Sequence, residues 1–151
     1  MIESIFIAKQ DGATQIELSE AELVAGKGIV GDRNFDRGTW PGQNITFVEM
    51  EEIEAFNKRH DRSIRLCDTR RNIITRGVRL NDLVGKRFSV GGIEFHGVEL
   101  CEPCRSLGDR LATDNMSASQ VVRAWVGKGG LRADVLGSGT LRVGMTLDFG
   151  H

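Results

Sequence analysis

Two cysteines of the chain, Cys101 and Cys104, are separated by two residues in the segment VELCEPCRSL. This spacing is compatible with half of a zinc site, with a redox pair, or with one working thiolate beside a structural neighbour. A structural zinc site commonly needs a second spaced pair of ligands, and neither the third cysteine nor the three histidines form one. A thioredoxin-like pair would open a helix early in an α/β unit, whereas this pair comes late in the chain. The pattern therefore favours a single nucleophilic or metal-binding thiolate.

Cys104 is the better candidate for that thiolate. Pro103 fixes the backbone just before it, and Arg105 places a cation next to it in the sequence. The following residues can start a helical turn, whose amide dipoles would favour an ionised thiol. Cys101 continues an apparent strand and is expected to be a small buried hydrophobic residue, while Cys67 gives no specific signal and is expected to be inert.

An arginine-rich segment at residues 69–80, TRRNIITRGVRL, supplies candidate anion-binding groups. Strand alternation would place Arg70 and Asn72 on one face and Arg71 and Ile73 on the other, so the arginines cannot all serve one site. Some of them would then lie on a solvated strand edge. Arg71 and Asn72 are the strongest candidates, because arginine binds phosphate or carboxylate in a bidentate manner and an amide can donate or accept.

Other polar residues complete the predicted anion-binding set. Arg76 belongs to the same segment, and Arg105 lies beside Cys104. The glycine-rich stretch at residues 26–34, GKGIVGDRN, lacks the spacing of a phosphate-binding loop, and no convincing helix follows it. We expect it to form a turn that borders a pocket, with Asp32 and Arg33 as polar lining.

Composition limits the classes of partner. The net charge of −1 argues against general attraction to nucleic acid or to a membrane surface. No apolar run approaches the roughly 20 residues that a membrane span requires, and the N-terminal segment lacks the features of a signal peptide. We therefore expect a cytoplasmic protein, in which thiols stay reduced.

Short apolar segments and 19 glycines indicate a turn-rich, mostly β protein with one domain over residues 1–151. Two helices are expected, one over residues 49–60 and one over residues 117–130, where Ser117 and Gln120 fit a capping box. These helices do not alternate with strands as in a parallel α/β fold. We therefore predict a closed or partly closed β-barrel with a few peripheral helices.

Four segments taken together resemble the MOSC domain, which is named for the C-terminal domain of molybdenum cofactor sulfurases. They are GIVGDRN, the run over residues 70–104, the helix that starts at Ser117, and GGLRADVLGSGTLRVG. The most specific part is the series Arg71-Asn72, Gly77, Leu83, Gly85 and Pro103-Cys104. The resemblance extends from Gly26 to Gly144.

The resemblance implies a β-barrel like the small domain of pyruvate kinase. It places the family's characteristic cysteine on Cys104 and its Arg-Asn pair on Arg71 and Asn72. It also implies either sulfur transport as a cysteine persulfide or binding of the molybdenum cofactor, whose pterin carries a phosphate. The chain departs from the family at Gly144-Met145, where Gly-Asp is usual.

A second departure concerns the source of sulfur. The eukaryotic sulfurases carry a desulfurase domain that depends on pyridoxal phosphate, and 151 residues leave no room for it. We therefore do not expect this chain to bind pyridoxal phosphate. Sulfur would come from a separate cysteine desulfurase.

Three functions remain open at this point, and whether the chain is an enzyme remains open with them. In the first, which the sequence favours, Cys104 receives sulfur as a persulfide and passes it to cofactor or metal-sulfur assembly. In the second, the chain is a small molybdenum-cofactor-dependent reductase of N-hydroxylated compounds, with Cys104 as the molybdenum ligand and electron-transfer proteins as partners. In the third, the barrel is a non-catalytic module for an anion or a partner protein, and its cysteines are inert.

Overall fold

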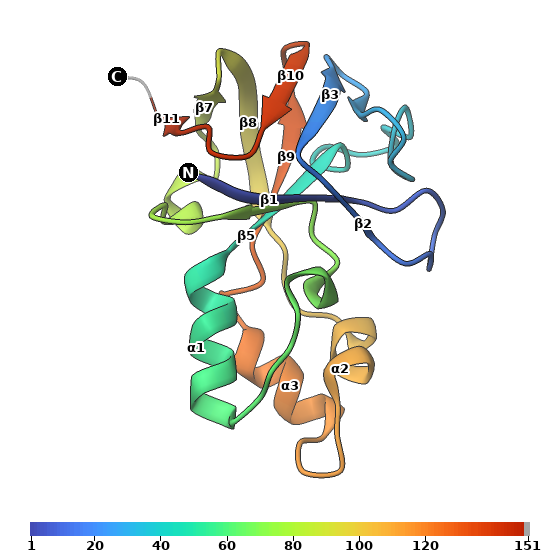
Figure 1. Cartoon of the computed structure of the whole chain (residues 1–151), viewed down its shortest axis with the longest axis vertical. Helices are drawn as coiled ribbons and strands as arrows, with labels where there is room; N and C mark the ends of the chain where they lie inside the picture. The colour runs from blue at the N-terminus through green and yellow to red at the C-terminus, as the bar shows by residue number, and fades with distance from the viewer. Residues whose placement is uncertain (150–151) are drawn as a thin grey trace.

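Short strands form a long bent sheet with three helices gathered at one end (Figure 1). The computed structural model describes residues 1–149, so the last two residues of the predicted domain lie outside the described residues. The strands are β1 (Ile2–Ile7), β2 (Ile16–Leu18), β3 (Glu20–Val24), β4 (Gly28–Ile29), β5 (Ile45–Glu49), β6 (Ile73–Thr75), β7 (Arg87–Val90), β8 (Ile93–Leu100), β9 (Leu131–Val135), β10 (Gly139–Arg142) and β11 (Leu147–Asp148). The helices are α1 (Met50–His60), α2 (Arg105–Leu111) and α3 (Ala118–Trp125), with short 3-10 helices η1 (Leu66–Thr69) and η2 (Leu80–Leu83).

The main sheet has the strand order β11-β7-β8-β9-β5-β6-β1-β2. Within the described residues its two edge strands do not pair with each other, so the sheet forms an open half-barrel. Strands β5 and β6 are parallel, and the other pairs of this sheet are antiparallel. A small second sheet has the order β10-β3-β4. The prediction of a mostly β, partly closed barrel is confirmed.

Strand β5 lies between two apolar cores. Phe47 points into the half-barrel, where its ring packs edge-on against Phe88 and Phe95 at centroid distances of 5.6 and 5.7 Å. Its neighbour Val48 points the other way, into a second core shared with the helices. Strand β6 is likewise buried on both faces, with Ile73 in the first core and Ile74 in the second. Burial on both faces explains why these strands read as continuous apolar runs.

The two predicted helices are confirmed at α1 and α3, although α3 ends at Trp125, five residues before the predicted end. Ile53 and Phe56 form the buried face of α1. The capping box before α3 is present. The backbone N–H of Gln120 donates to the Ser117 hydroxyl, and the backbone N–H of Ser117 donates to Gln120 Oε1. Trp125, at the end of α3, is fully buried in the second core. In residues 1–149 no helix has the length and apolar character needed to cross a membrane.

A third helix, α2, directly follows Cys104, where the sequence indicated only the start of a helical turn. This helix packs against α3 through Gly108. A methyl group at Gly108 would come within 2.8 Å of the Ala118 carbonyl oxygen and 2.9 Å of Val122 Cγ2. The glycine allows close approach of the two helices, and it also weakens the helical signal of this short segment in the sequence.

Replacing Gly108 with alanine tests this packing. A glycine-to-alanine change in a free helix stabilises it by about 0.5–1 kcal/mol, but here we expect the free energy of unfolding to fall by about 1–3 kcal/mol because of the clash with α3. Urea denaturation measures the change. Gly38→Ala is the control, since its added methyl group meets only one atom, at 4.0 Å. A Gly108→Ala protein as stable as the Gly38→Ala protein would contradict this account of the contact between α2 and α3.

Candidate functional site

Cys104 immediately precedes α2, in an extended backbone conformation, and its side chain is exposed. Hydrogen bonding to the backbone N–H of Leu107 lowers the pKa of the Cys104 thiol, and this effect outweighs partial burial, which raises it. The Ser106 backbone and hydroxyl groups and the positive charge of Arg71 also lower this pKa. The first turn of α2 thus favours the thiolate, as the sequence predicted from helix dipoles.

The cation beside the thiol is not the one expected from the sequence. Arg105 extends into solvent, where its side chain is 93% exposed and its Nε lies 3.8 Å from Asp109 Oδ2. Arg71, which precedes β6, supplies the nearby charge instead. A residue adjacent in sequence can point away from its neighbour at the start of a helix. The expected anion-binding role of Arg105 stays a prediction.

Cys101 differs sharply from Cys104. It follows β8 and is 1% exposed, and burial raises the pKa of its thiol. Its backbone N–H donates to the Gly130 carbonyl at 2.7 Å, and Gly129 packs directly against its carbonyl oxygen. The expectation that Cys101 is a buried neighbour is confirmed. Cys67 is partly buried in η1.

Two arginines, Arg71 and Arg110, interact electrostatically with the exposed thiol, and Arg70 and Arg33 interact in turn with Arg110. We call Arg33, Arg70, Arg71 and Arg110 the arginine cluster. Burial lowers the pKa of Arg110, and the positive charges of Arg70, Arg71 and Arg33 lower it further, while Cys104 acts in the opposite direction. Burial also lowers the pKa of Arg70, with a contribution from Arg33. Arg110 is thus the member of the cluster that lies within electrostatic reach of the other three guanidinium groups and of the thiol.

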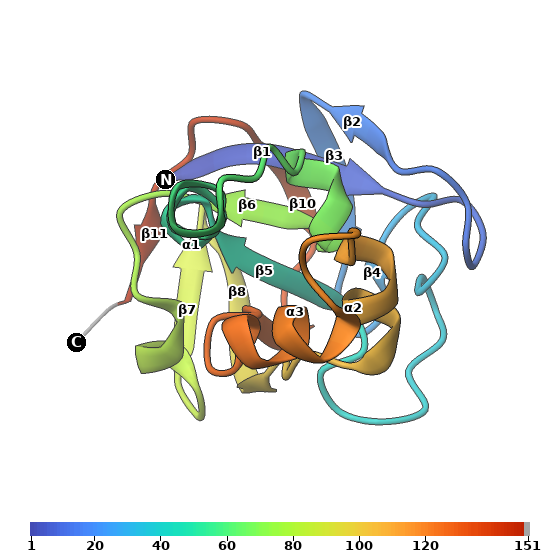
Figure 2. The same ribbon diagram turned by 90° about the horizontal axis from the view of Figure 1, so that it is seen from below.

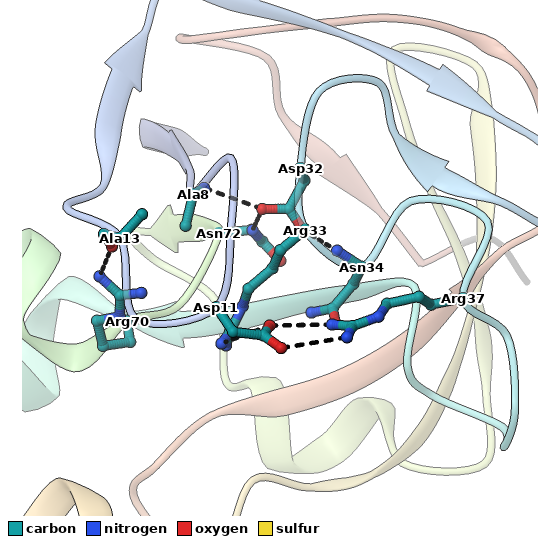
Figure 3. A network of polar contacts seen from close by, with 9 residues as sticks. All are labelled: Ala8, Asp11, Ala13, Asp32, Arg33, Asn34, Arg37, Arg70 and Asn72. Carbon is teal, nitrogen blue, oxygen red and sulfur yellow. Dashed lines mark hydrogen bonds and ion pairs between the residues drawn. The ribbon is translucent and has the colours of Figure 1, made fainter.

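Backbone oxygen atoms hold most of the arginine cluster in place. Three guanidinium groups donate to carbonyl groups: Arg70 to Ala13, Arg71 to Gly129 and Arg110 to Asp68. In the described part of the chain, none of these three forms an ion pair with a carboxylate. Arg33 is 3.5 Å from Asp11, which also pairs with Arg37 (Figure 3). The cluster is therefore fixed in position while much of its positive charge remains available to an anion.

Asn72 lies beneath the arginine cluster and is buried. Its side-chain oxygen accepts from the Thr46 N–H and hydroxyl groups at 3.1 and 3.2 Å. Its amide nitrogen donates to the Phe6 carbonyl at 3.1 Å and to Asp32 Oδ1 at 3.4 Å. The amide thus links β1, β5 and β6 and positions Arg71. Its predicted contact with a ligand stays a prediction.

Asp32, like Asn72, is buried and hydrogen-bonded to other parts of the chain. It is 6% exposed, and its carboxylate accepts from the Ala8 and Asn34 backbone N–H groups at 3.1 and 3.2 Å (Figure 3). These bonds fix the turn over residues 26–34 that carries Arg33. The turn was predicted from its glycines. Of the two predicted lining residues, Arg33 lines a hollow described below, whereas Asp32 is not among the residues that line that hollow.

Arg76 is not brought to the arginine cluster. It follows β6, whereas Arg71 precedes it, and the three-residue strand between them is itself about 10 Å long. Its guanidinium group bonds Glu3 at 2.7 Å and Glu54 at 3.0 Å. The expected alternation of residues 70–73 also fails, because Arg70 has a left-handed backbone with φ of 64° and β6 begins only at Ile73.

Sequence reasoning missed Arg70 and Arg110 as site residues. Arg110 reaches the site because α2 places it one to two turns after Cys104, whereas the sequence indicated only a first helical turn there. Arg70 depends on the left-handed end of η1. The excess of arginine over lysine, 15 of 20 basic residues, was the only signal for them.

A hollow of about 520 Å³ adjoins the arginine cluster on the side of Arg33. Arg37, Arg132 and Trp40 also line it, and Trp40 is 56% exposed. A flat aromatic surface beside cations suits a planar anionic ligand. As for metals, residues 1–149 contain no group of three or more His, Cys, Asp or Glu side chains that could hold an ion.

The pKa difference between Cys101 and Cys104 predicts their reactivity. We expect the rate of alkylation of Cys104 by iodoacetamide to rise with pH around a midpoint lower than that of an ordinary cysteine, because the thiolate is the reacting form and the pKa of this thiol is lowered. Cys104→Ser should abolish this fast phase, and Cys101→Ser should preserve it. Mass spectrometry of quenched samples gives the rates. A fast phase that survives in Cys104→Ser would assign the reactive thiol to another residue.

The fold is similar to that of several solved bacterial proteins. The YuaD protein of Bacillus subtilis has a TM-score of 0.82 at 19% identity, over 97% of this chain and 92% of that one. YiiM of Geobacillus stearothermophilus has a TM-score of 0.76 at 14% identity, over 100% and 76% of the two chains. YiiM of Escherichia coli has a TM-score of 0.71 at 15% identity, over 99% and 69%. At these identities the likeness concerns the fold.

Comparison with curated protein sequences gave no match. The family model of the MOSC domain matches residues 34–148, which include Cys104 and most of the arginine cluster. The association with pyridoxal phosphate finds no support in these comparisons. Because the model covers about three quarters of the sequence, the chain belongs to the MOSC domain family.

Proposed function

We propose that this MOSC domain carries sulfur as a persulfide on Cys104. The observation that carries the proposal is the contrast between the two neighbouring thiols. Cys104 is exposed and has a lowered pKa, whereas Cys101 is buried and has a raised pKa. A carrier thiol must be ionised to attack, and it must be accessible first to a donor and then to an acceptor.

Loading is a transfer between sulfur atoms. Cys104 Sγ attacks the outer sulfur of a cysteine persulfide on a separate desulfurase and forms a new S–S bond. The S–S bond of the donor breaks, and its electron pair leaves on the donor thiolate, so the step needs no external oxidant. The Leu107 and Ser106 amides and Arg71, which favour the Cys104 thiolate, also lie where they can stabilise an anionic persulfide.

The arginine cluster supports an acceptor that carries a phosphate. Its partly buried guanidinium groups are held by carbonyl groups and have charge available for an anion. MOSC domains are associated with the molybdenum cofactor, and the phosphate of its pterin fits this donor set. In this assignment Arg70, Arg71 and Arg110 hold the phosphate and Cys104 faces the bound group. The cofactor, when bound, would supply the molybdenum centre.

A second function is favoured by the same juxtaposition of thiolate and arginines. A thiolate is also a ligand for a soft metal centre, so Cys104 could hold molybdenum in a small reductase of N-hydroxylated compounds that receives electrons from partner proteins. In that case the chain retains molybdenum in a ratio near one per molecule when purified from a host that makes the cofactor. Cys104→Ser would lose it.

Mass spectrometry tests sulfur loading directly. After incubation with a cysteine desulfurase and cysteine, the chain should gain the mass of one sulfur atom, and peptide mapping should place it on Cys104. Cys101→Ser is the matched control and should load normally, whereas Cys104→Ser should not. The absence of added sulfur on the unaltered chain, under conditions where the desulfurase is itself loaded, would contradict the carrier function. Stoichiometric molybdenum in the same unloaded preparation would favour the reductase.

A further inference from the structure

A hollow of about 870 Å³ lies between the end of α1 and helix α3, and its charged lining is mostly basic. The side chains concerned are Arg59, His60, Arg62, Arg123 and Lys128, with Asp61 as the one acid among its lining residues. Figure 2, which looks onto this end of the molecule, shows α1, α2 and α3 on a common face. The residues that line the hollow come from the end of α1, from α3 and from the segments next to them, all at this end of the molecule.

A second hollow connects this region with the candidate site. It has a volume of about 480 Å³ and shares Arg62 with the first hollow. Its lining also includes Arg65, Asp68 and Arg110, and Arg110 belongs to the arginine cluster around Cys104. We call Arg59, Arg62, Arg65, Arg110, Arg123 and Lys128 the basic track.

Arg62 is the fixed link in the middle of the basic track. Its guanidinium group donates to the Leu111 carbonyl at 2.7 Å, at the end of α2. It also contacts Met116 Sδ at 3.5 Å and lies over the Phe56 ring, 5.5 Å from the centroid. From Leu111 back to Cys104 the helix spans about 10 Å. A protein interface that buries about 800 Å² on each side would readily cover both ends of α2.

The positive charge of the basic track is poorly compensated. Within residues 1–149, neither Arg59, Arg123 nor Lys128 takes part in an ion pair. Asp68, the acid of the second hollow, is already paired with Arg65 at 3.1 Å. The whole chain has a net charge of −1, so this accumulation of basic side chains is local. Such a patch attracts a partner of opposite charge and speeds its association.

We infer that the basic track is the docking surface for a protein with an acidic surface that exchanges sulfur with Cys104. The inference rests on the proposed carrier function, because a carrier thiol must be approached by another protein. A protein is favoured over nucleic acid because the lining of the two hollows contains no Phe, Tyr or Trp for base stacking, and Asp61 and Asp68 interrupt the positive charge. The track guides the partner along α2 towards the exposed thiol.

Charge reversal at two exposed positions tests the docking surface. The double variant Arg59→Glu/Arg123→Glu changes side chains that do not touch Cys104. Lys27→Glu/Lys86→Glu is the matched control, because both lysines are exposed, neither lines these hollows, and the change in net charge is the same. The probe is a fluorescein-labelled poly-glutamate peptide, titrated at low and at physiological salt.

We expect the Arg59/Arg123 variant to bind the peptide at least about tenfold more weakly at low salt, with a smaller difference at higher salt. The control should bind within about twofold of the unaltered chain. Equal binding by all three proteins would overturn the docking surface and leave the carrier function untouched. Tighter binding of a single-stranded oligonucleotide than of the peptide, lost in the Arg59/Arg123 variant, would overturn it in favour of nucleic acid.

Persulfide loading of the same three proteins separates the two proposals. With a loaded cysteine desulfurase, the Arg59/Arg123 variant should load at least about tenfold more slowly than the control at low salt. Its alkylation by iodoacetamide, a neutral small molecule, should be unchanged, which shows that the Cys104 thiol is intact. Equal loading rates in the Arg59/Arg123 variant and the control would contradict the docking surface but would not contradict the carrier function. If none of the three proteins is loaded, both the carrier function and the docking role of the basic track are contradicted.

Discussion

The buried side-chain amide of Asn72 is the interaction on which the candidate site depends. It joins Thr46 of β5, Phe6 of β1 and the carboxylate of Asp32, so two strands, a turn and the segment that leads into β6 share one set of hydrogen bonds. Arg71 directly precedes Asn72 in the sequence, and Arg33 directly follows Asp32. A side chain without hydrogen-bonding groups at this position would leave buried partners unpaired, at a cost of about 1–3 kcal/mol for each group. The buried amide thus helps to position Arg71 and Arg33, the neighbours in sequence of Asn72 and Asp32.

The arginines of the chain differ in whether carbonyl groups or carboxylates bind their guanidinium groups. Backbone carbonyl groups orient Arg70, Arg71 and Arg110 without an opposing carboxylate, whereas Arg76, at the far end of β6, is paired with two acids. The carbonyl-bound cations remain able to attract an anion, and the one nearest the thiol also favours its ionised form. Together with the amides of the first turn of α2, they place a thiol with a lowered pKa beside positive charge that is not paired with carboxylates. Both functions considered for this MOSC domain use that combination.

Local patterns predicted much of this structure, and contacts between distant segments explain what they missed. The capping box at Ser117 and the distinction between the two cysteines were readable, because each depends on a few adjacent residues. Only the first turn of α2 was predicted, because Gly108 weakens the helix propensity of the segment while allowing contact with α3. Without that helix, Arg110 could not be assigned to the site. Arg76 was grouped with the site because β6 was not recognised as a three-residue strand that separates it from Arg71. The half-open state of the barrel depends on pairing between strands far apart in the chain, which periodicity does not specify.

As a sulfur carrier, Cys104 must both receive and release sulfur. A single-turnover chase with isotopically labelled sulfur tests this most directly. The chain is loaded by a desulfurase with labelled cysteine, separated from the donor, and mixed with an acceptor thiol while whole-protein mass spectra are recorded over time. We expect one labelled sulfur per chain on Cys104, and we expect this sulfur to pass to the acceptor at a rate that Cys101→Ser does not change. Label on another cysteine, or label on Cys104 that the acceptor cannot remove, would contradict it.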